Sequence, residues 1–92
     1  IVYLELQRRG YDVYVGKLDT KEIDFVAEKQ GKIIYVQVAY LLSDDKTQER
    51  EFGNLLQIED NFPKFVVSMD EVDMSQKGII HLNIKDFLLS RW

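Results

Sequence analysis

Hydrophobic and polar positions change their spacing several times along the chain, and each spacing predicts a different kind of element. Apolar residues three or four positions apart predict a helix, and alternation predicts a strand with one buried face. The helical spacing occurs at residues 1–9, 43–58 and 84–90. The alternating or β-rich spacing occurs at residues 11–18, 21–29, 32–41, 64–69 and 78–82. The predicted order is helix, three strands, helix, strand, and a short strand–helix extension.

Local signals predict where these elements begin and end. Gly10 suits the left-handed position after a helix, and Gln30-Gly31 suits a two-residue hairpin turn. Ser43 is expected to cap the central helix and Asn83 the last one, because both side chains accept a backbone N–H well. Gly53 suggests close packing of the central helix, since a glycine there costs about 1 kcal/mol relative to alanine. A short turn is expected at Asp19-Thr20.

The same pattern assigns faces. In the second strand, one face is expected to carry Ile23, Phe25 and Ala27, and the other Glu22, Asp24, Val26 and Glu28. The third strand is apolar on both faces, as expected for a buried central strand. One side of the central helix is expected to carry Phe52, Leu55, Leu56 and Glu59. Three meandering strands and a helical crossover predict an α/β domain whose mixed central sheet is flanked by helices.

Length and composition narrow the class of protein. Ninety-two residues form a single domain, 1–92. The apolar opening Ile1-Val2-Tyr3-Leu4 resembles the end of a helix that begins upstream, so we expect a fragment of a longer chain. The absence of cysteine excludes disulfides and thiolate metal sites. The chain has no long apolar run and no signal peptide, so we expect a cytoplasmic location without a membrane partner. The net charge of −4 disfavours a dedicated nucleic-acid binder.

Three polar residues are candidates for chemistry. Asp24 and Gln37 each lie about six residues from the hairpin turn, so they can stand beside each other on adjacent strands. Glu5 projects from the first helix. Three oxygen-bearing side chains of this kind could hold a hard cation such as Mg²⁺. Each also has a structural interpretation: Asp24 and Gln37 as hydrogen-bonded strand residues, and Glu5 as a solvated surface residue.

The order of elements and these residues resemble the PD-(D/E)XK nuclease superfamily. The resemblance implies a restriction-endonuclease-like αβββαβ core with a short β-α extension. Asp24 stands at the metal-binding Asp position, Gln37 at the Glu/Gln position and Glu5 at the helix-borne Glu position. Ala39 stands at the Lys position, where it can neither take a proton nor stabilise developing charge. Lys32 or Lys21 could take over that role only by migration.

Four strings resemble, more narrowly, the uncharacterised C-terminal domain of a group of prokaryotic AAA-type ATPases. They are residues 22–26 (EIDFV), 35–40 (YVQVAY), 50–56 (REFGNLL) and 63–70 (PKFVVSMD). The resemblance implies an upstream ATPase module in the same chain as the partner. This segment has no glycine-rich phosphate loop of its own. Lone His81, without cysteine or a second histidine, does not indicate a zinc site.

The loss of the lysine leads us to expect a non-catalytic accessory domain that serves docking, regulation or target recognition for that ATPase and needs no cofactor. Two alternatives stay open. One is a metal-dependent DNA endonuclease with a rearranged site, in which Asp24, Gln37 and Glu5 would bind Mg²⁺. The other is a nucleic-acid-binding module that does not cleave.

Overall fold

The computed structural model describes residues 1–18 and 21–90, without the side chains at 17, 18, 21 and 22. The turn expected at Asp19-Thr20 therefore lies outside the described residues. The helices are α1 (Val2–Arg8), α2 (Asp45–Leu56) and α3 (Ile84–Leu89). The strands are β1 (Asp12–Leu18), β2 (Lys21–Lys29), β3 (Lys32–Val38), β4 (Lys64–Ser68) and β5 (Ile80–Asn83). This is the order that the hydrophobic pattern predicts.

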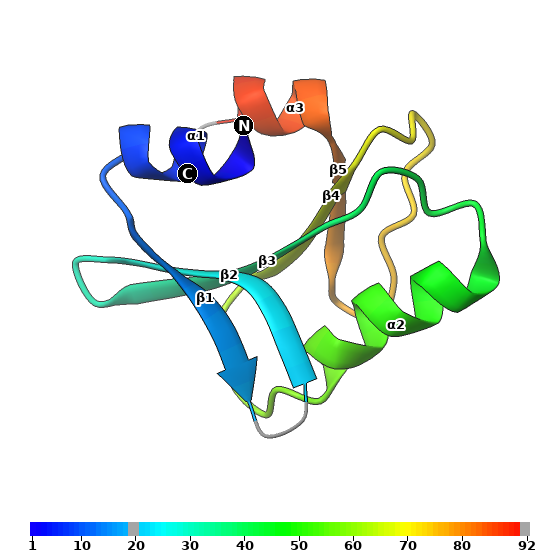
Figure 1. Ribbon diagram of the computed structural model, residues 1–92, viewed down its shortest axis with the longest axis horizontal. Helices are drawn as coiled ribbons and strands as arrows, with labels where there is room; N and C mark the ends of the chain where they lie inside the picture. Colours follow the sequence, from blue (N-terminus) through cyan, green and yellow to red (C-terminus); the bar gives the residue numbers. More distant parts are fainter. Residues whose placement is uncertain (19–20, 91–92) are drawn as a thin grey trace.

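The five strands form one mixed sheet in the order β1-β2-β3-β4-β5. The first three strands pair antiparallel as a meander, and β3, β4 and β5 pair parallel. Helices α1 and α3 cover one face of the sheet, and α2 covers the other (Figure 1). The prediction of a small α/β domain with a mixed, helix-flanked sheet is thus confirmed. No helix in the described ranges is long and apolar enough to cross a membrane.

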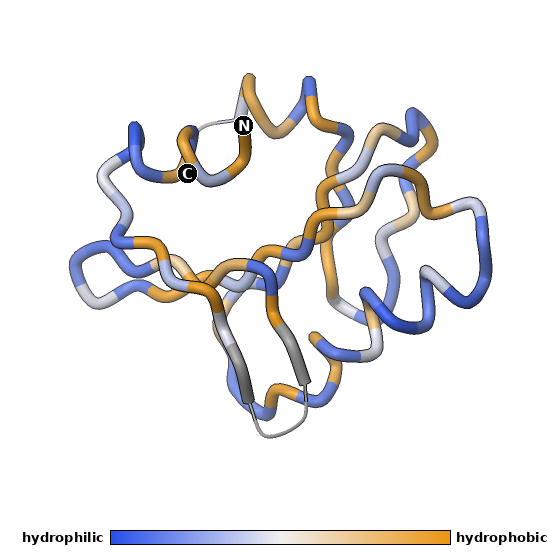
Figure 2. The backbone as a smooth tube through the Cα atoms, viewed as in Figure 1, coloured by the Kyte–Doolittle hydropathy of each residue, from blue (hydrophilic) through white to orange (hydrophobic). Residues whose placement is uncertain are grey.

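Two hydrophobic clusters hold the layers together, one on each side of the sheet. The α1/α3 cluster contains Val2, Leu6, Tyr11, Ala27, Ile34, Val36, Phe65, Val67 and Phe87. The α2 cluster contains Ile23, Tyr35, Leu42, Phe52, Leu55, Val66 and Ile79. Strand β3 contributes to both clusters, which confirms its prediction as a central strand buried on both faces. Figure 2 shows many hydrophobic residues along the strands of the sheet and mostly hydrophilic residues along α2.

The local signals predict most element ends correctly. Gly10 has φ +91°, and the N–H groups at 10 and 11 donate to the carbonyls of Gln7 and Leu6, which is a Schellman ending. Both hairpin residues, Gln30 and Gly31, have positive φ, as a type I′ turn requires. Asn83 caps α3 by accepting the Lys85 N–H. The prediction for Ser43 is wrong, because Asp44 caps α2 through the N–H of Lys46.

Strand β2 departs from simple alternation because it carries one extra residue. Its pairing with β1 passes from Tyr14↔Val26 to Gly16↔Ile23, so Asp24 and Phe25 together lie opposite one residue of β1. A β-bulge of this kind shifts side chains to the opposite face. Ile23 consequently packs in the α2 cluster with Val26, whereas Phe25 packs on the α1/α3 side. The prediction that Ile23, Phe25 and Ala27 share a face is therefore wrong for Ile23.

The inner face of α2 is also rotated from the expected one. Its buried residues are Glu51, Phe52 and Leu55, whereas Leu56 is 42% exposed and Glu59 is exposed. The expected close packing at Gly53 is wrong too, since a Cβ added there meets no atom within 4 Å.

Replacing Gly53 by alanine is expected to stabilise the domain by about 0.5–1 kcal/mol, because alanine loses less backbone freedom in a helix than glycine does. The helical position is open, so the added methyl group fits without strain. Urea unfolding followed by circular dichroism measures the change. The matched change Gly16→Ala should do the opposite, because the new Cβ would lie 2.6 Å from Val26 Cγ2 and overpack the sheet. A destabilised Gly53→Ala variant would contradict the open packing seen at this position.

Candidate functional site

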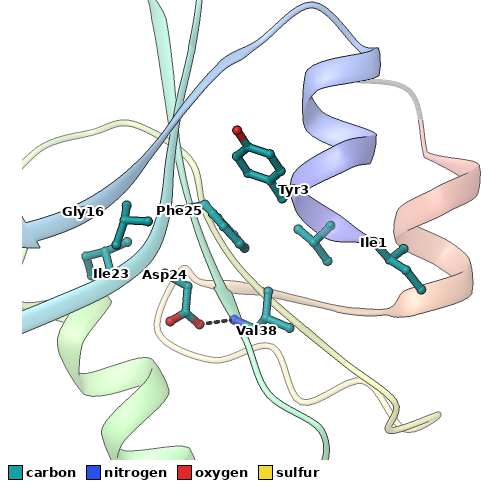
Figure 3. Close-up of a pocket in the computed structure, with 9 residues that line it drawn as sticks. Ile1, Tyr3, Gly16, Ile23, Asp24, Phe25 and Val38 are labelled. Atoms are coloured by element: carbon teal, nitrogen blue, oxygen red, sulfur yellow. Dashed lines mark hydrogen bonds between the residues drawn. The ribbon is translucent and has the colours of Figure 1, made fainter.

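Asp24 and Gln37 meet where the pairing between β2 and β3 stops. The regular ladder ends at Phe25↔Val36. One step further, the Asp24 N–H donates to Gln37 Oε1 at 2.7 Å, and the Val38 N–H donates to Asp24 Oδ2 at 2.8 Å. Figure 3 shows the carboxylate turned toward the Val38 nitrogen. Side-chain hydrogen bonds thus replace the backbone hydrogen bonds that the ladder lacks here. Asp24 and Gln37 lie side by side on β2 and β3, as predicted from their equal distance to the hairpin turn.

The bulge in β2 is what opens the sheet at this point. The extra residue turns the end of the strand away from β3, which leaves the amides of Asp24 and Val38 without backbone partners across the gap. Gly16 allows β1 to follow this bend, because a side chain there would collide with Val26 and crowd Ile23. The candidate site therefore depends on backbone geometry as much as on its polar residues.

A largely apolar pocket of about 550 Å³ lies beside Asp24, between the start of α1 and the bulge. Its described lining consists of Ile1, Val2, Tyr3, Val15, Gly16, Ile23, Asp24, Phe25 and Val38. Tyr3 lies over Phe25 with the ring centroids 5.9 Å apart (Figure 3). Asp24 is the acidic residue of this described lining. The pocket could thus receive an apolar group whose charged or polar end contacts one carboxylate.

Glu51 on α2 is a residue near this site that the sequence interpretation missed. It is only 9% exposed, and its Oε1 accepts from Arg50 Nε at 3.3 Å. Its Oε2 is buried and has no hydrogen-bond partner among the described residues. Burial raises the pKa of the Glu51 carboxyl; the Arg50 hydrogen bond opposes this, and the nearby charge of Asp24 adds to the increase. Helical spacing was the available signal, since Glu51 lies one turn before Leu55.

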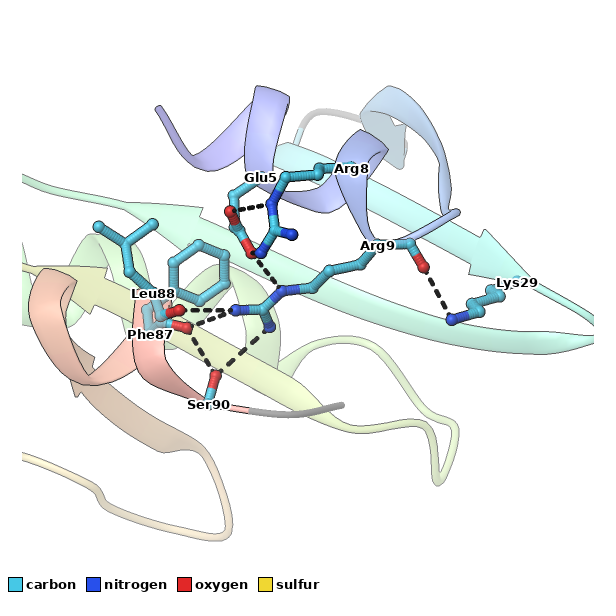
Figure 4. A network of polar contacts seen from close by, with 7 residues as sticks. All are labelled: Glu5, Arg8, Arg9, Lys29, Phe87, Leu88 and Ser90. Atoms are coloured by element: carbon cyan, nitrogen blue, oxygen red, sulfur yellow. Dashed lines mark hydrogen bonds and ion pairs between the residues drawn. The ribbon is translucent and has the colours of Figure 1, made fainter.

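Glu5 does not line the pocket beside Asp24. Its carboxylate accepts hydrogen bonds from Arg8 Nε and Nη2 at 3.0 and 2.7 Å and from Arg9 Nε at 2.7 Å. Arg9 extends from there to α3, where Nη2 donates to the Phe87 carbonyl at 2.7 Å (Figure 4). Glu5 is thus part of a clamp between the first and last helices, and the structure brings only Asp24 and Gln37 of the three candidates together.

Acid is expected to weaken this clamp over a defined range. Hydrogen bonds from Arg8 and then Arg9 lower the pKa of Glu5 from 4.5 to about 2. Because the folded-state value is the lower one, the stabilisation is complete above about pH 4.5 and is lost as the pH falls toward 2. Urea midpoints measured from pH 2 to 6 should fall across this range. Glu5→Gln should make that dependence shallower without removing it, because the pKa values of Asp60, Asp70 and Asp73 are lowered as well. Glu28→Gln, at an exposed position of β2, should leave the full dependence in place.

Ala39 continues the chain just beyond β3 and stands where the resemblance to the nuclease superfamily leads us to expect a lysine. Its N–H donates to the Val67 carbonyl at 3.0 Å, and its methyl group packs against the α2 cluster. Lys32 begins β3, at the opposite end of the strand from Gln37. The side chain of Lys21 lies outside the description. Nζ of Lys29 donates to the Arg9 carbonyl, and Nζ of Lys64 contacts Asp60, so both amines have partners elsewhere.

His81, Ser68 and Asp70 form a second polar group that superficially resembles a nucleophilic triad. His81 Nδ1 accepts the Met74 N–H, which places the proton on Nε2, and Nε2 lies 2.7 Å from Ser68 Oγ. Ser68 Oγ then donates to Asp70 Oδ2 at 2.7 Å. The serine hydroxyl therefore donates its hydrogen bond to the aspartate and not to the histidine, whereas a nucleophilic serine donates to the histidine that acts as its base. This group ties β4 and β5 to the loop between them.

A divalent cation is the cofactor that the candidate site could hold. No group of three or more His, Cys, Asp or Glu side chains suited to a metal occurs in the part of the chain that the structure describes. Asp24 on β2 and Glu51 on α2 carry carboxylates, and Glu51 Oε2 has no protein partner in that part, whereas the Gln37 oxygen already accepts the Asp24 N–H. Mg²⁺ is commonly bound through one or two carboxylates and several waters. The described residues therefore supply at most two carboxylates near this point, Asp24 and Glu51.

Comparison with known proteins adds one relative. An uncharacterised protein of Haemophilus influenzae (strain ATCC 51907 / DSM 11121 / KW20 / Rd) is 44% identical over 90 residues, which is 97% of this chain. The chain spans only 22% of the length of that relative. No family model matches the chain. The chain is therefore similar to one segment of a much longer bacterial protein.

Proposed function

We propose that this domain is a non-catalytic module of the restriction-endonuclease-like fold, part of a longer chain that contains an AAA-type ATPase. Its role there would be docking, regulation or target recognition. The observation that carries the proposal is Ala39: the position of the catalytic lysine holds a methyl group packed toward α2. The order of elements and the mixed sheet support the fold, since both fit an αβββαβ core with a β-α extension.

The chemistry of phosphodiester cleavage explains why this substitution matters. Cleavage develops negative charge on the phosphate, and a nearby cation such as a lysine stabilises it. Asp24 Oδ2 and Gln37 Oε1 are also occupied by backbone N–H groups, so part of the site serves to hold the strands. A module of this kind keeps the shape of a nuclease while its polar residues maintain the fold.

The length of the relative supports the larger context. A segment corresponding to 22% of a bacterial protein leaves ample chain for a separate ATPase module. A nucleotide-binding module would show itself by a G-x-x-x-x-G-K-[ST] motif in the remaining sequence, since that loop cradles the phosphates. Reading the rest of the natural chain for this motif is a direct check on the proposed partner.

A nuclease assay tests the catalytic part of the proposal. The domain is incubated with single-stranded, duplex and branched DNA in Mg²⁺ and in Mn²⁺, beside Asp24→Ala and an Asp12→Ala control at an exposed position of β1. We expect no cleavage above that of Asp24→Ala. Cleavage by the unaltered domain and by Asp12→Ala that disappears in Asp24→Ala would overturn the proposal and favour a metal-dependent endonuclease with a rearranged site.

One observation favours that endonuclease as the second candidate. Glu51 supplies a carboxylate close enough to Asp24 for the two charges to influence each other, and Asp24 borders an open pocket. A two-carboxylate site can activate water through a bound cation without a lysine, at a lower rate. In the same assay, this candidate requires that Glu51→Gln abolish cleavage as completely as Asp24→Ala does.

A further inference from the structure

The single histidine of the chain, His81, lies on β5 and is buried with hydrogen bonds at both ring nitrogens. Its Nδ1 accepts the Met74 N–H at 3.1 Å, and its Nε2 lies 2.7 Å from Ser68 Oγ. An imidazole nitrogen accepts a hydrogen bond only while it carries no proton of its own. The contact with Met74 therefore requires the neutral form of His81.

His81 holds two consecutive residues of the loop 69–79, which joins β4 to β5. Its ring accepts from Met74, and its backbone N–H donates to Ser75 Oγ at 2.8 Å. Met74 in turn packs, partly buried, against the α2 cluster. A proton on Nδ1 would set two N–H donors against each other at hydrogen-bond distance, and neither could accept. Protonation of the ring would thus force Met74 away from His81.

The charged groups around His81 come mainly from the same loop. The charges of Asp70 and Asp73 both act on the ring, and negative charges favour a protonated imidazole. From β4, the ring is contacted by the uncharged Ser68. Glu51, the acidic residue on the inner face of α2, is influenced by other charges. Burial and the Met74 N–H favour the neutral ring, so the histidine has two competing states with different partners.

We propose that His81 is a pH-sensitive latch for the loop 69–79: the neutral ring holds Met74 against the α2 cluster, and the protonated ring releases it while the sheet stays folded. Histidine suits this role because its charge changes near neutral pH. The release is local, because the pairing of β4 with β5 and the bond from the His81 N–H to Ser75 do not involve the ring. The inference goes beyond the proposed function, since it gives the module a surface whose exposure depends on pH.

NMR between pH 8 and pH 5 tests the latch on the whole 92-residue chain. At pH 8 the ring nitrogen shifts should show the form with its proton on Nε2. As the ring becomes charged, the Met74 amide should lose protection from hydrogen exchange by about tenfold, relative to the intrinsic exchange rate at each pH, because it loses its one acceptor. The Ala39 amide, which donates to the Val67 carbonyl within the sheet, is the control and should stay protected.

Two substitutions separate the roles of the two ring nitrogens. The Oδ1 atom of asparagine is as far along the side chain as Nδ1, so His81→Asn should keep the Met74 amide protected and remove its pH dependence. The longer His81→Gln side chain reaches toward Ser68 instead and should leave the Met74 amide poorly protected at both ends of the pH range. Circular dichroism establishes that each variant is folded.

Three results would overturn the latch. The first is a Met74 amide that stays protected after the ring has become charged. The second is a ring that remains neutral down to pH 5, because the latch would then never open in the folded domain. The third is a pH dependence at Met74 that survives in His81→Asn. Loss of protection at Ala39 together with Met74 would also count against it, since the release would then be general unfolding.

Discussion

Replacing Arg9 by alanine is expected to lower the free energy of unfolding by about 2 kcal/mol, because the guanidinium packs on α3 and its loss leaves a carbonyl acceptor there without its donor. The side chains of Arg9 and Glu5 are only 9% and 10% exposed. The guanidinium also donates to the Phe87 carbonyl and lies 4.9 Å from the centroid of the Phe87 ring. Its removal leaves buried acceptors on both α1 and α3 without this donor, which costs more than losing a surface contact. Urea unfolding at pH 7 measures the effect.

Arg8→Ala is the matched control for this prediction. Arg8 contacts the same carboxylate of Glu5 at 2.7 Å, but its side chain is 72% exposed. Exposed ion pairs contribute little to stability, so this variant should remain close to the unaltered domain. Equal losses for the two variants would show that the contacts between Arg9 and α3 contribute nothing measurable to stability.

Replacing Gln37 by leucine is expected to destabilise the domain by about 2 kcal/mol, because a buried N–H that loses its acceptor costs its full desolvation penalty. Leucine nearly preserves the volume, but it leaves the Asp24 N–H without the Gln37 oxygen, in a place where Gln37 itself is only 1% exposed. Hydrogen exchange gives the specific readout, since the Asp24 amide should lose protection more than the amides of the regular β2–β3 ladder. Urea unfolding gives the overall loss.

Gln57→Leu, at an exposed position just after α2, serves as the control for Gln37→Leu. Surface substitutions usually change stability by no more than about 0.5 kcal/mol, so this variant should unfold almost as the unaltered domain does. If the Asp24 amide stayed protected in Gln37→Leu, the hydrogen bond would not be the reason for a buried glutamine at this position. The conservative change Gln37→Asn, whose shorter side chain keeps an amide oxygen, should recover only part of the lost protection.

The adjacency of Asp24 and Gln37 was predictable because a two-residue turn fixes the register of a hairpin. Counting from Gln30-Gly31 therefore places them correctly. The bulge at Asp24 was not predictable in this way. An extra residue changes which residues pair between two strands, but the sequence of the strand gives no recognisable sign of it. Ile23 was accordingly assigned to the wrong face. Alternation is a reliable guide up to the first irregularity in the ladder.

The third residue of the candidate site could not be predicted correctly from the sequence, for a different reason. Glu5 was chosen because a helix-borne carboxylate fits the superfamily pattern, but nothing in the sequence shows that two arginines and α3 hold it. Glu51 lies on α2, whose inner face was expected to include Leu56 but instead includes Glu51 beside Phe52. A small rotation of α2 in the interpretation thus concealed a buried carboxylate. Such polar residues depend on tertiary contacts, which hydrophobic periodicity does not report.

The clamp between α1 and α3 has a consequence for how the domain is made. Arg9 and its acceptor at Phe87 are separated by 78 positions, so the contact closes a loop that includes all five strands of the sheet. Contacts of such long range form late, because the entropy of closing the loop must be overcome first. During synthesis, α1 leaves the ribosome before α3 and cannot make this contact until α3 follows. The domain should therefore reach its full resistance to proteolysis only when translation has passed the last helix.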